Sequence, residues 1–123
     1  MKQALIGVVR MKIIAAEHRG FCYGVKRAVA MAEECVGKSG EIHTLGPIIH
    51  NPQMVKRLSD KGIDVANDLS QISDNSTIII RSHGVGPEIY KEAQTKNLHI
   101  MDATCPHVKK AQQAAFQLLE DGY

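Results

Sequence analysis

The sequence has few of the features that mark specialised classes of protein. It contains no Trp, two Phe and three Tyr, so a core must be built mainly from aliphatic side chains. Fifteen Lys and Arg against thirteen Asp and Glu leave a formal charge of +2, which is too small an excess to indicate a nucleic-acid or membrane surface. The opening apolar run covers only residues 4–9, which is shorter than a signal-peptide core or a membrane span. We therefore expect a soluble, cytoplasmic protein.

Cysteine is also scarce, with three residues in the chain. That number excludes a dense disulfide framework, and an odd count without a secretory leader is typical of reduced thiols or metal ligands. The length of 123 residues, 44% of them hydrophobic, suits one domain that buries roughly two-thirds of its unfolded surface.

Apolar runs separated by turn signals alternate between strand and helix. Strands are predicted near 12–16, 41–45, 63–65, 77–81 and 98–101, and helices near 24–36, 51–60, 87–96 and 106–120. This alternation predicts an α/β fold with a mainly parallel sheet and flanking helices. The β-branched run at 77–80 is typical of a strand that is buried on both faces.

The same pattern predicts the domain organisation. Residues 1–10 are interpreted as an extension of uncertain origin, because Met11 could itself begin the chain. Residues 11–105 should form a first α/β lobe that includes the strand at 12–16. Residues 106–123 should begin a second, truncated lobe, because the last helix ends near Gly122 without the strand that the pattern requires. We find no internal repeat.

Four predicted strand-to-helix junctions carry reactive or polar side chains. They are the segments 19–24, 46–52, 81–87 and 102–106. In a parallel sheet such junctions lie at one edge, outside the carboxyl ends of the strands, where ligands bind. We therefore expect Cys22, Cys105, His50 and His83 to converge.

The starts of the predicted helices favour negative charge at that edge. A proline suits the first helical position, and prolines occur at 52, 87 and 106. The expected N-caps are Asn51, Gly86 and Cys105. A helix N-terminus stabilises a thiolate and attracts phosphate groups. These features predict a metal site that faces a phosphorylated ligand.

Other side chains near these junctions have less specific interpretations. Cys35 lies inside the first helix, where a structural thiol is the favoured interpretation. Lys26 and Arg27 either face a bound anion or, as the favoured alternative, form a solvated surface. His107 could join Cys105 as a metal ligand, although a packed or exposed imidazole is the ordinary case. Zinc and cubane sites usually take four protein ligands, so histidines or residues from outside the chain must complete the set.

The four junction motifs together resemble those of one known family. RGFCYGVKRA at 19–28, LGPIIHN at 45–51, RSHGV at 81–85 and DATCP at 102–106 are similar, in order, to motifs of the LytB family of 4-hydroxy-3-methylbut-2-enyl diphosphate reductases. The resemblance extends from about Met11 to Tyr123. It implies that the chain is the N-terminal portion of such a reductase.

The resemblance implies a trilobed α/β protein with one lobe and the start of a second in this chain. The implied enzyme is an iron–sulfur oxidoreductase of the non-mevalonate pathway that converts its substrate to isopentenyl and dimethylallyl diphosphate by reductive dehydroxylation. It further implies a [4Fe–4S] cluster with Cys22 and Cys105 as two of three protein ligands, and a diphosphate held by His50 and His83. Ferredoxin or flavodoxin is the implied electron donor, with no nucleic-acid or membrane partner.

The remaining parts of the implied active site have no match in the chain. The third cluster cysteine and the proton-donor glutamate are expected beyond Tyr123, so no catalytic residue is assigned here and the chain alone should be inactive. Two alternatives stay open. One is a zinc-dependent hydrolase or lyase that uses Cys22, Cys105 and His83. The other is a non-catalytic anion-binding module whose cysteines are inert.

Overall fold

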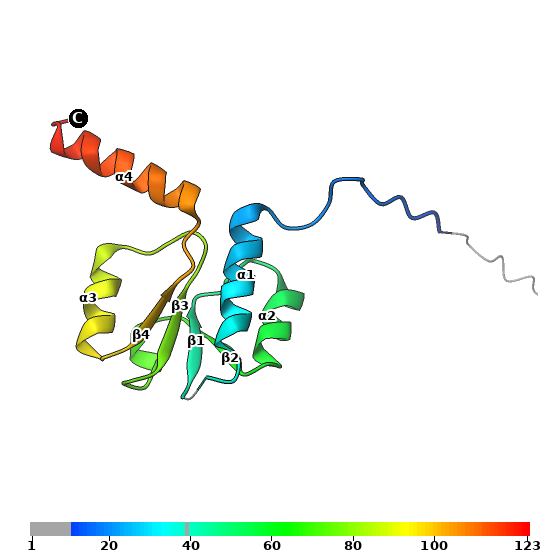
Figure 1. Ribbon diagram of the computed structural model, residues 1–123, viewed down its shortest axis with the longest axis horizontal. Helices are drawn as coiled ribbons and strands as arrows, with labels where there is room; N and C mark the ends of the chain where they lie inside the picture. Colours follow the sequence, from blue (N-terminus) through cyan, green and yellow to red (C-terminus); the bar gives the residue numbers. More distant parts are fainter. Residues whose placement is uncertain (1–10, 39) are drawn as a thin grey trace, which may run out of the picture.

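A computed structural model of the chain describes residues 11–38 and 40–123. Its centre is a four-stranded parallel sheet with the strand order β2-β1-β3-β4 (Figure 1). The strands are β1 (Ile42–Leu45), β2 (Ile63–Ala66), β3 (Thr77–Ile80) and β4 (His99–Asp102). The helices are α1 (Tyr23–Cys35), α2 (Pro52–Ser59), α3 (Pro87–Thr95), α4 (Pro106–Glu120) and the short 3₁₀ helix η1 (Leu69–Gln71). The predicted α/β class is confirmed, and η1 is the one element that was not predicted.

Helices cover both faces of the sheet. On one face, α1 and α2 bury Ala28, Ala32 and Leu58 in the same cluster as Ile79 of β3. On the other face, α3 and η1 pack against Ile78 and Ile80 of the same strand. All four residues of β3 are buried, as the run of β-branched residues predicted. The sheet is therefore rigid at its centre, and its carboxyl edge is a stable platform for the junctions.

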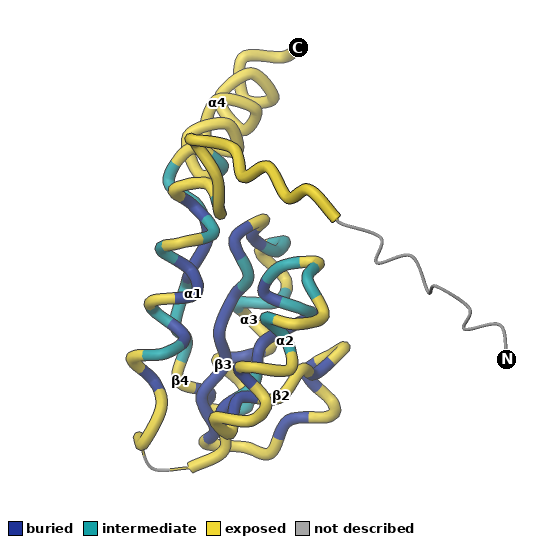
Figure 2. The backbone as a smooth tube through the Cα atoms, turned by 90° about the vertical axis from the view of Figure 1, so that its right-hand side faces the viewer, coloured by how far each residue is buried: buried dark blue, intermediate teal, exposed yellow. Residues whose placement is uncertain are grey.

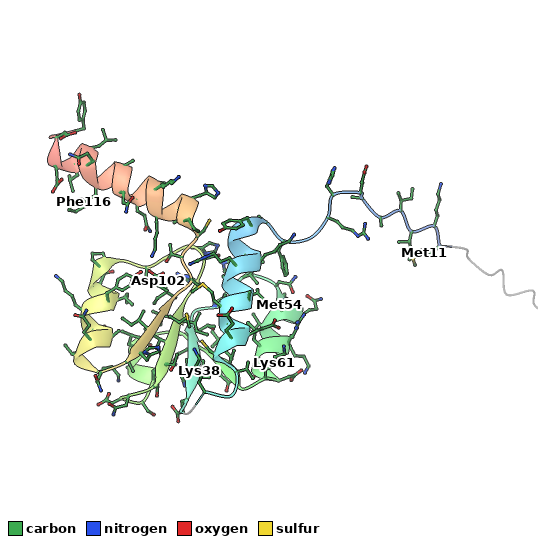
Figure 3. The ribbon with its side chains drawn as sticks, in the orientation of Figure 1. Met11, Lys38, Met54, Lys61, Asp102 and Phe116 are labelled. Carbon is green, nitrogen blue, oxygen red and sulfur yellow. The ribbon has the colours of Figure 1, made fainter. Side chains whose placement is uncertain are left out.

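The strand predicted at 12–16 is wrong. Residues 11–16 pair with no strand in the described part of the chain, and Ile13 and Ile14 are 83% and 78% exposed. Figures 1 and 3 show this segment, with Met11, extending away from the sheet. Strand propensity depends on packing against neighbouring strands, and here Ile13 and Ile14 have no such neighbours. The extension predicted at 1–10 lies outside the described residues.

Helix α4 follows β4 but does not pack on the sheet. None of its residues is buried, and it projects beyond the carboxyl edge (Figure 2). Phe116 is 61% exposed and stands away from the sheet in Figure 3. Across 11–38 and 40–123, no helix is both long enough and apolar enough to cross a membrane. That α4 begins a second lobe stays a prediction.

The central position of β3 predicts where a substitution lowers the stability of the fold most. Replacing Ile79, which is fully buried, by Ala should lower the free energy of unfolding by about 2–5 kcal/mol, because the cavity cannot be filled from either layer. Urea titration followed by circular dichroism measures this change. The control is Val65→Ala on the edge strand β2, where Val65 is 38% exposed and the cost should stay below about 1 kcal/mol. Equal costs at the two positions would contradict the described core.

Candidate functional site

The three predicted N-caps are confirmed, and Cys22, which was not predicted as a cap, occupies the same position in α1. The caps are Cys22 for α1, Asn51 for α2, Gly86 for α3 and Cys105 for α4. Asn51 caps in the usual way, since its Oδ1 accepts a hydrogen bond from Met54 N at 2.9 Å. The thiols of Cys22 and Cys105 make no such capping bond. Both cysteines therefore present sulfur at a helix N-terminus without using it to cap the helix.

Cys105 lies against Gly24, two residues after Cys22. Gly24 is buried in the first turn of α1, directly after the cap Cys22 and Tyr23. A Cβ atom built on Gly24 would lie 2.6 Å from Cys105 Sγ and 2.9 Å from Cys105 Cβ. The Cys105 thiol therefore lies against the first turn of the helix that Cys22 caps. The rings of Tyr23 and His107 also pack edge to face, with centroids 6.2 Å apart.

The peptide group between Thr104 and Cys105 joins three parts of the edge. Its carbonyl oxygen, Thr104 O, accepts a hydrogen bond from Arg27 Nη1 of α1 at 3.3 Å. Its N–H, that of Cys105, donates to Ser82 O at 2.9 Å. The favoured interpretation of Arg27 as part of a solvated surface is therefore wrong, because the structure places its guanidinium on a backbone carbonyl.

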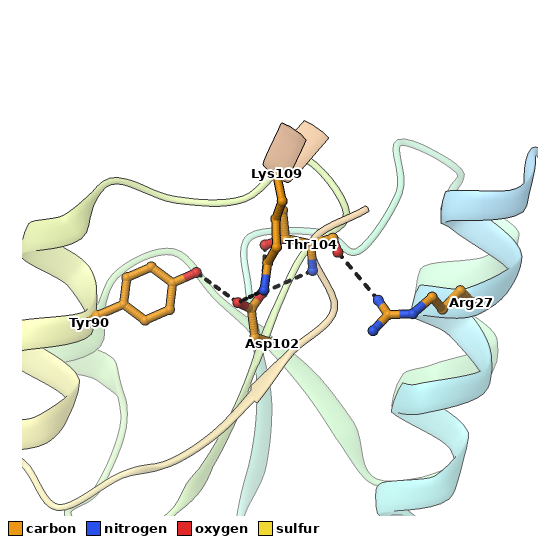
Figure 4. A network of polar contacts seen from close by, with 5 residues as sticks. All are labelled: Arg27, Tyr90, Asp102, Thr104 and Lys109. Atoms are coloured by element: carbon orange, nitrogen blue, oxygen red, sulfur yellow. Dashed lines mark hydrogen bonds and ion pairs between the residues drawn. The ribbon is translucent and has the colours of Figure 1, made fainter. Parts of the chain in front are cut away.

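Asp102, the last residue of β4, holds the same loop from the other side (Figure 4). Its Oδ1 accepts hydrogen bonds from Thr104 N at 3.0 Å and from the Thr104 hydroxyl. Its Oδ2 accepts from Tyr90 Oη at 3.1 Å and pairs with Lys109 Nζ at 2.7 Å. Burial favours the neutral acid, but the bonds from Lys109 and Thr104 together outweigh it and lower the pKa of Asp102 to about 2. The loop that carries Cys105 is thus held by an ionised carboxylate.

His50 and His83 converge as predicted. Their rings are stacked, with centroids 5.8 Å apart and an interplanar angle of 24°. Both residues are exposed, so their ring nitrogens are accessible to a ligand. His83 also lines an open groove of about 900 Å³ between α3 and α4, together with Tyr90 and Lys109.

Arg81 is a part of this edge that the sequence analysis did not single out. It follows β3 directly, and its Nη1 lies 2.5 Å from where a Cβ of Gly46 would stand. Gly46 has a φ of +69°, a backbone conformation that favours glycine, and the absence of a side chain there leaves room for the Arg81 guanidinium. Arg81 Nε is buried without a hydrogen-bond partner, and no ion pair of the described residues includes Arg81. The sequence did contain a signal for Arg81: it follows an apolar strand directly and has no acidic residue next to it.

Cys35 lies apart from this edge, in agreement with its interpretation as a structural thiol. It ends α1, is fully buried in the core cluster, and its Sγ donates to Met31 O at 3.5 Å. Burial raises the pKa of the Cys35 thiol. A neutral, packed thiol of this kind is not a metal ligand.

The described residues supply part of a metal site and not a whole one. No group of three His, Cys, Asp or Glu side chains within 11–38 and 40–123 is arranged to hold a metal ion. The zinc site of Cys22, Cys105 and His83 is therefore not assembled in this part of the chain. The thiols of Cys22 and Cys105 lie at neighbouring helix N-termini and make no capping hydrogen bond, and Gly24 leaves room for the thiol of Cys105. They fit two ligands of a metal cluster whose other ligands come from elsewhere.

Comparison with known proteins shows which family the chain belongs to. Residues 13–123 match the family described as LytB protein. The chain belongs to this family. It is 54% identical over 113 residues to the 4-hydroxy-3-methylbut-2-enyl diphosphate reductase of Trichlorobacter lovleyi and 53% identical to that of Geobacter metallireducens. In both cases the match covers 92% of this chain and 40% of the relative, so the chain spans less than half of these relatives.

Two solved structures have the same fold. One is the E-1-hydroxy-2-methyl-but-2-enyl-4-diphosphate reductase from Plasmodium falciparum, with a TM-score of 0.83 and 34% identity over 87% of this chain and 34% of that one. The other is described as (E)-4-hydroxy-3-methyl-but-2-enyl diphosphate reductase, the terminal enzyme of the non-mevalonate pathway. It has a TM-score of 0.78 and 49% identity, over 90% of this chain and 40% of that one.

The sequence also contains a short repeat that the sequence analysis missed. Residues 22–28 (CYGVKRA) and 105–111 (CPHVKKA) share Cys, Val, Lys and Ala at the same four places. In both copies the cysteine caps a helix, and the cations Arg27 and Lys110 occupy equivalent positions. The two thiols therefore occupy the same position at the start of a helix. The repeat in the sequence indicated that these two helix starts are alike.

The contact at Gly24 reverses the ordinary effect of a helix substitution. Glycine in a helix interior usually costs up to about 1 kcal/mol relative to Ala. Gly24→Ala should instead lower the free energy of unfolding by about 1–2 kcal/mol, because the new methyl group overlaps Cys105 Sγ. Urea titration measures whether the substitution lowers or raises the free energy of unfolding. The control is Ala30→Gly at an exposed position of α1, which should show the ordinary helix cost, and a stabilising Gly24→Ala would show that Cys105 does not lie there.

The lowered pKa of Asp102 predicts a pH dependence of stability. The carboxylate stabilises the fold above its ordinary pKa of 3.8, and this contribution is lost as the pH falls towards about 2. Asp102→Asn should therefore cost about 1–2 kcal/mol near pH 6, with a smaller difference from the unmodified chain below pH about 3. Urea titrations across this range measure the difference. The control is Asp60→Asn, which removes an exposed pair with Lys56 and should cost less than about 0.5 kcal/mol; a pH-independent Asp102 effect would contradict the account.

Proposed function

We propose that this chain is the N-terminal part of an iron–sulfur reductase. The reaction is the reductive dehydroxylation of 4-hydroxy-3-methylbut-2-enyl diphosphate to isopentenyl and dimethylallyl diphosphate. The observation that carries the proposal is the packing of the Cys105 thiol on the helix that Cys22 caps, at the edge that also bears stacked histidines. The names of the relatives support the same reaction. Because the chain covers 40% of these relatives, the remaining ligands and the proton donor belong to the rest of such a protein.

Cys22 and Cys105 would hold a [4Fe–4S] cluster as two of its protein ligands. When bound, the cluster would store electrons from a ferredoxin or flavodoxin and act as a Lewis acid towards the leaving oxygen. The N-termini of α1 and α4, with their free N–H groups, would favour the negative charge of a cluster held there. Gly24 keeps the Cys105 sulfur close to α1.

His50, His83 and Arg81 would bind the diphosphate. The two imidazoles lie close enough to contact one phosphate group together, and when protonated they donate charge-assisted hydrogen bonds. Arg81 carries a permanent charge, and its buried Nε has no hydrogen-bond partner. A guanidinium without a carboxylate partner is suited to a phosphate, which it can contact through two parallel hydrogen bonds.

Anaerobic reconstitution and substrate titration of a full-length reductase that carries this segment test these roles. Cys22→Ser and Cys105→Ser should each lose most of the visible absorption of the cluster. His50→Ala, His83→Ala and Arg81→Gln should each weaken substrate binding by about tenfold or more, because each removes a charge-assisted bond, and should retain that absorption.

A matched control and three contrary results make this test specific. His99 is exposed at the opposite, amino end of β4, so His99→Ala should change neither binding nor absorption. Loss of absorption in the His50 or His83 variant would reassign that residue as a metal ligand. Stoichiometric zinc in anaerobically purified protein would favour the hydrolase, and absence of any metal would favour the anion-binding module.

A further inference from the structure

We propose that Arg27 is a positioning residue for the two cysteines. Its guanidinium holds the Thr104–Cys105 peptide group against α1, so that Cys105 stays on Gly24 beside the helix that Cys22 caps. The importance of this position for a cluster rests on the proposed function. The position itself rests only on the described contacts.

The first support is the place where Arg27 makes its contact. The acceptor, Thr104 O, lies 77 residues further along the chain and belongs to the residue directly before Cys105. Arg27 itself lies only five residues after Cys22 on the same helix. One side chain therefore connects the two cysteine-bearing segments, and Figure 4 shows it reaching from α1 to the loop after β4.

The second support is that the other described hydrogen bonds and ion pairs of the loop do not reach α1. Asp102 binds Thr104 within the loop, and Tyr90 and Lys109 hold Asp102 from α3 and α4. Cys105 N donates to Ser82 O, which belongs to the loop after β3. These bonds fix the loop relative to β3, β4 and α3. The Arg27 bond is the described polar contact that fixes it relative to the helix of Cys22.

The repeat in the sequence places a second long cation at the equivalent point of α4. Lys110 occupies the position in the second copy that Arg27 occupies in the first, so both cysteine-capped helices carry a long cation five residues after the cysteine. Neither Arg27 nor Lys110 forms an ion pair with an acidic residue in the described part of the chain. In the first copy, the acceptor of the cation is the backbone carbonyl Thr104 O.

The test uses the three cysteines of the chain as internal reporters. The labelling rate of each thiol with a monofunctional alkylating reagent can be followed separately by peptide mass spectrometry. In Arg27→Met, Cys105 should label about fivefold faster, because a hydrogen bond of ordinary net strength is lost. Cys22 is already exposed and Cys35 is fully buried, so neither rate should change.

Two further variants separate positioning from general stability. Arg27→Lys should restore most of the slow labelling of Cys105, because a long cation can still reach the carbonyl. Arg57→Met removes the surface bond to Glu33 and should leave all three rates unchanged. An unchanged Cys105 rate in Arg27→Met would overturn the proposal, and so would an equal rise at Cys35, which would indicate general unfolding.

Iron uptake by a full-length reductase that carries this segment, measured beside the labelling, distinguishes this proposal from the proposed function. If the chain is not part of an iron–sulfur protein, the full-length wild type will take up no iron under anaerobic reconstitution, while the Cys105 labelling pattern still holds. If Arg27 has no positioning role, iron uptake will be normal in the wild type, and the Cys105 rate will not respond to the substitution.

Discussion

A single peptide group, between Thr104 and Cys105, connects the elements that carry the candidate ligands. Its carbonyl is bound by Arg27 on the helix that Cys22 caps, and its N–H is bound to Ser82 beside His83. Backbone groups at a loop must find partners when they are removed from water, and here those partners come from two distant segments. Backbone hydrogen bonding therefore connects the segments that carry Cys22, His83 and Cys105.

The electrostatics of the edge follow from this arrangement. Asp102 is ionised but already bound by Lys109, Tyr90 and Thr104, so its negative charge is compensated within the network. Arg81 lies at the same edge without such compensation. With two helix N-termini presenting thiols, the edge favours negative ligands, which suits both a thiolate-bound cluster and a diphosphate.

Much of the fold could be predicted because local signals and burial agree. The β-branched run of β3, the prolines that open three helices and the glycines of the turns each indicate one structure. From residue 23 onwards the α-helices and strands begin and end within one residue of their expected bounds, and η1 alone among the described elements was not expected. The segment 12–16 failed because Ile13 and Ile14 have strand propensity but no neighbouring strand among the described residues. Propensity alone cannot supply the missing partner.

The site was predictable in outline for a different reason. Parallel topology places His50, His83 and Cys105 at one edge, whichever side chains later stabilise them. Cys22 lies at that edge as the N-cap of α1, since the strand expected before it does not form in the described part of the chain. The roles of Arg27, Arg81 and Asp102 could not be predicted in the same way, because they depend on contacts between residues far apart in the sequence. The contact between Gly24 and Cys105 is of this kind, although the repeat of CxxVK at 22–26 and 105–109 indicated that the two helix starts are equivalent.

The most direct measurement of the central claim is hydrogen exchange of the Cys105 amide, followed by nuclear magnetic resonance on the uniformly ¹⁵N-labelled chain. If Cys105 N–H is bound to Ser82 O, it should exchange about as slowly as the neighbouring Ala103 amide, which donates to Ile80 O at 3.0 Å in the sheet. Exchange of Cys105 at the rate of an unstructured peptide, with Ala103 still protected, would show that this peptide group does not join the two loops.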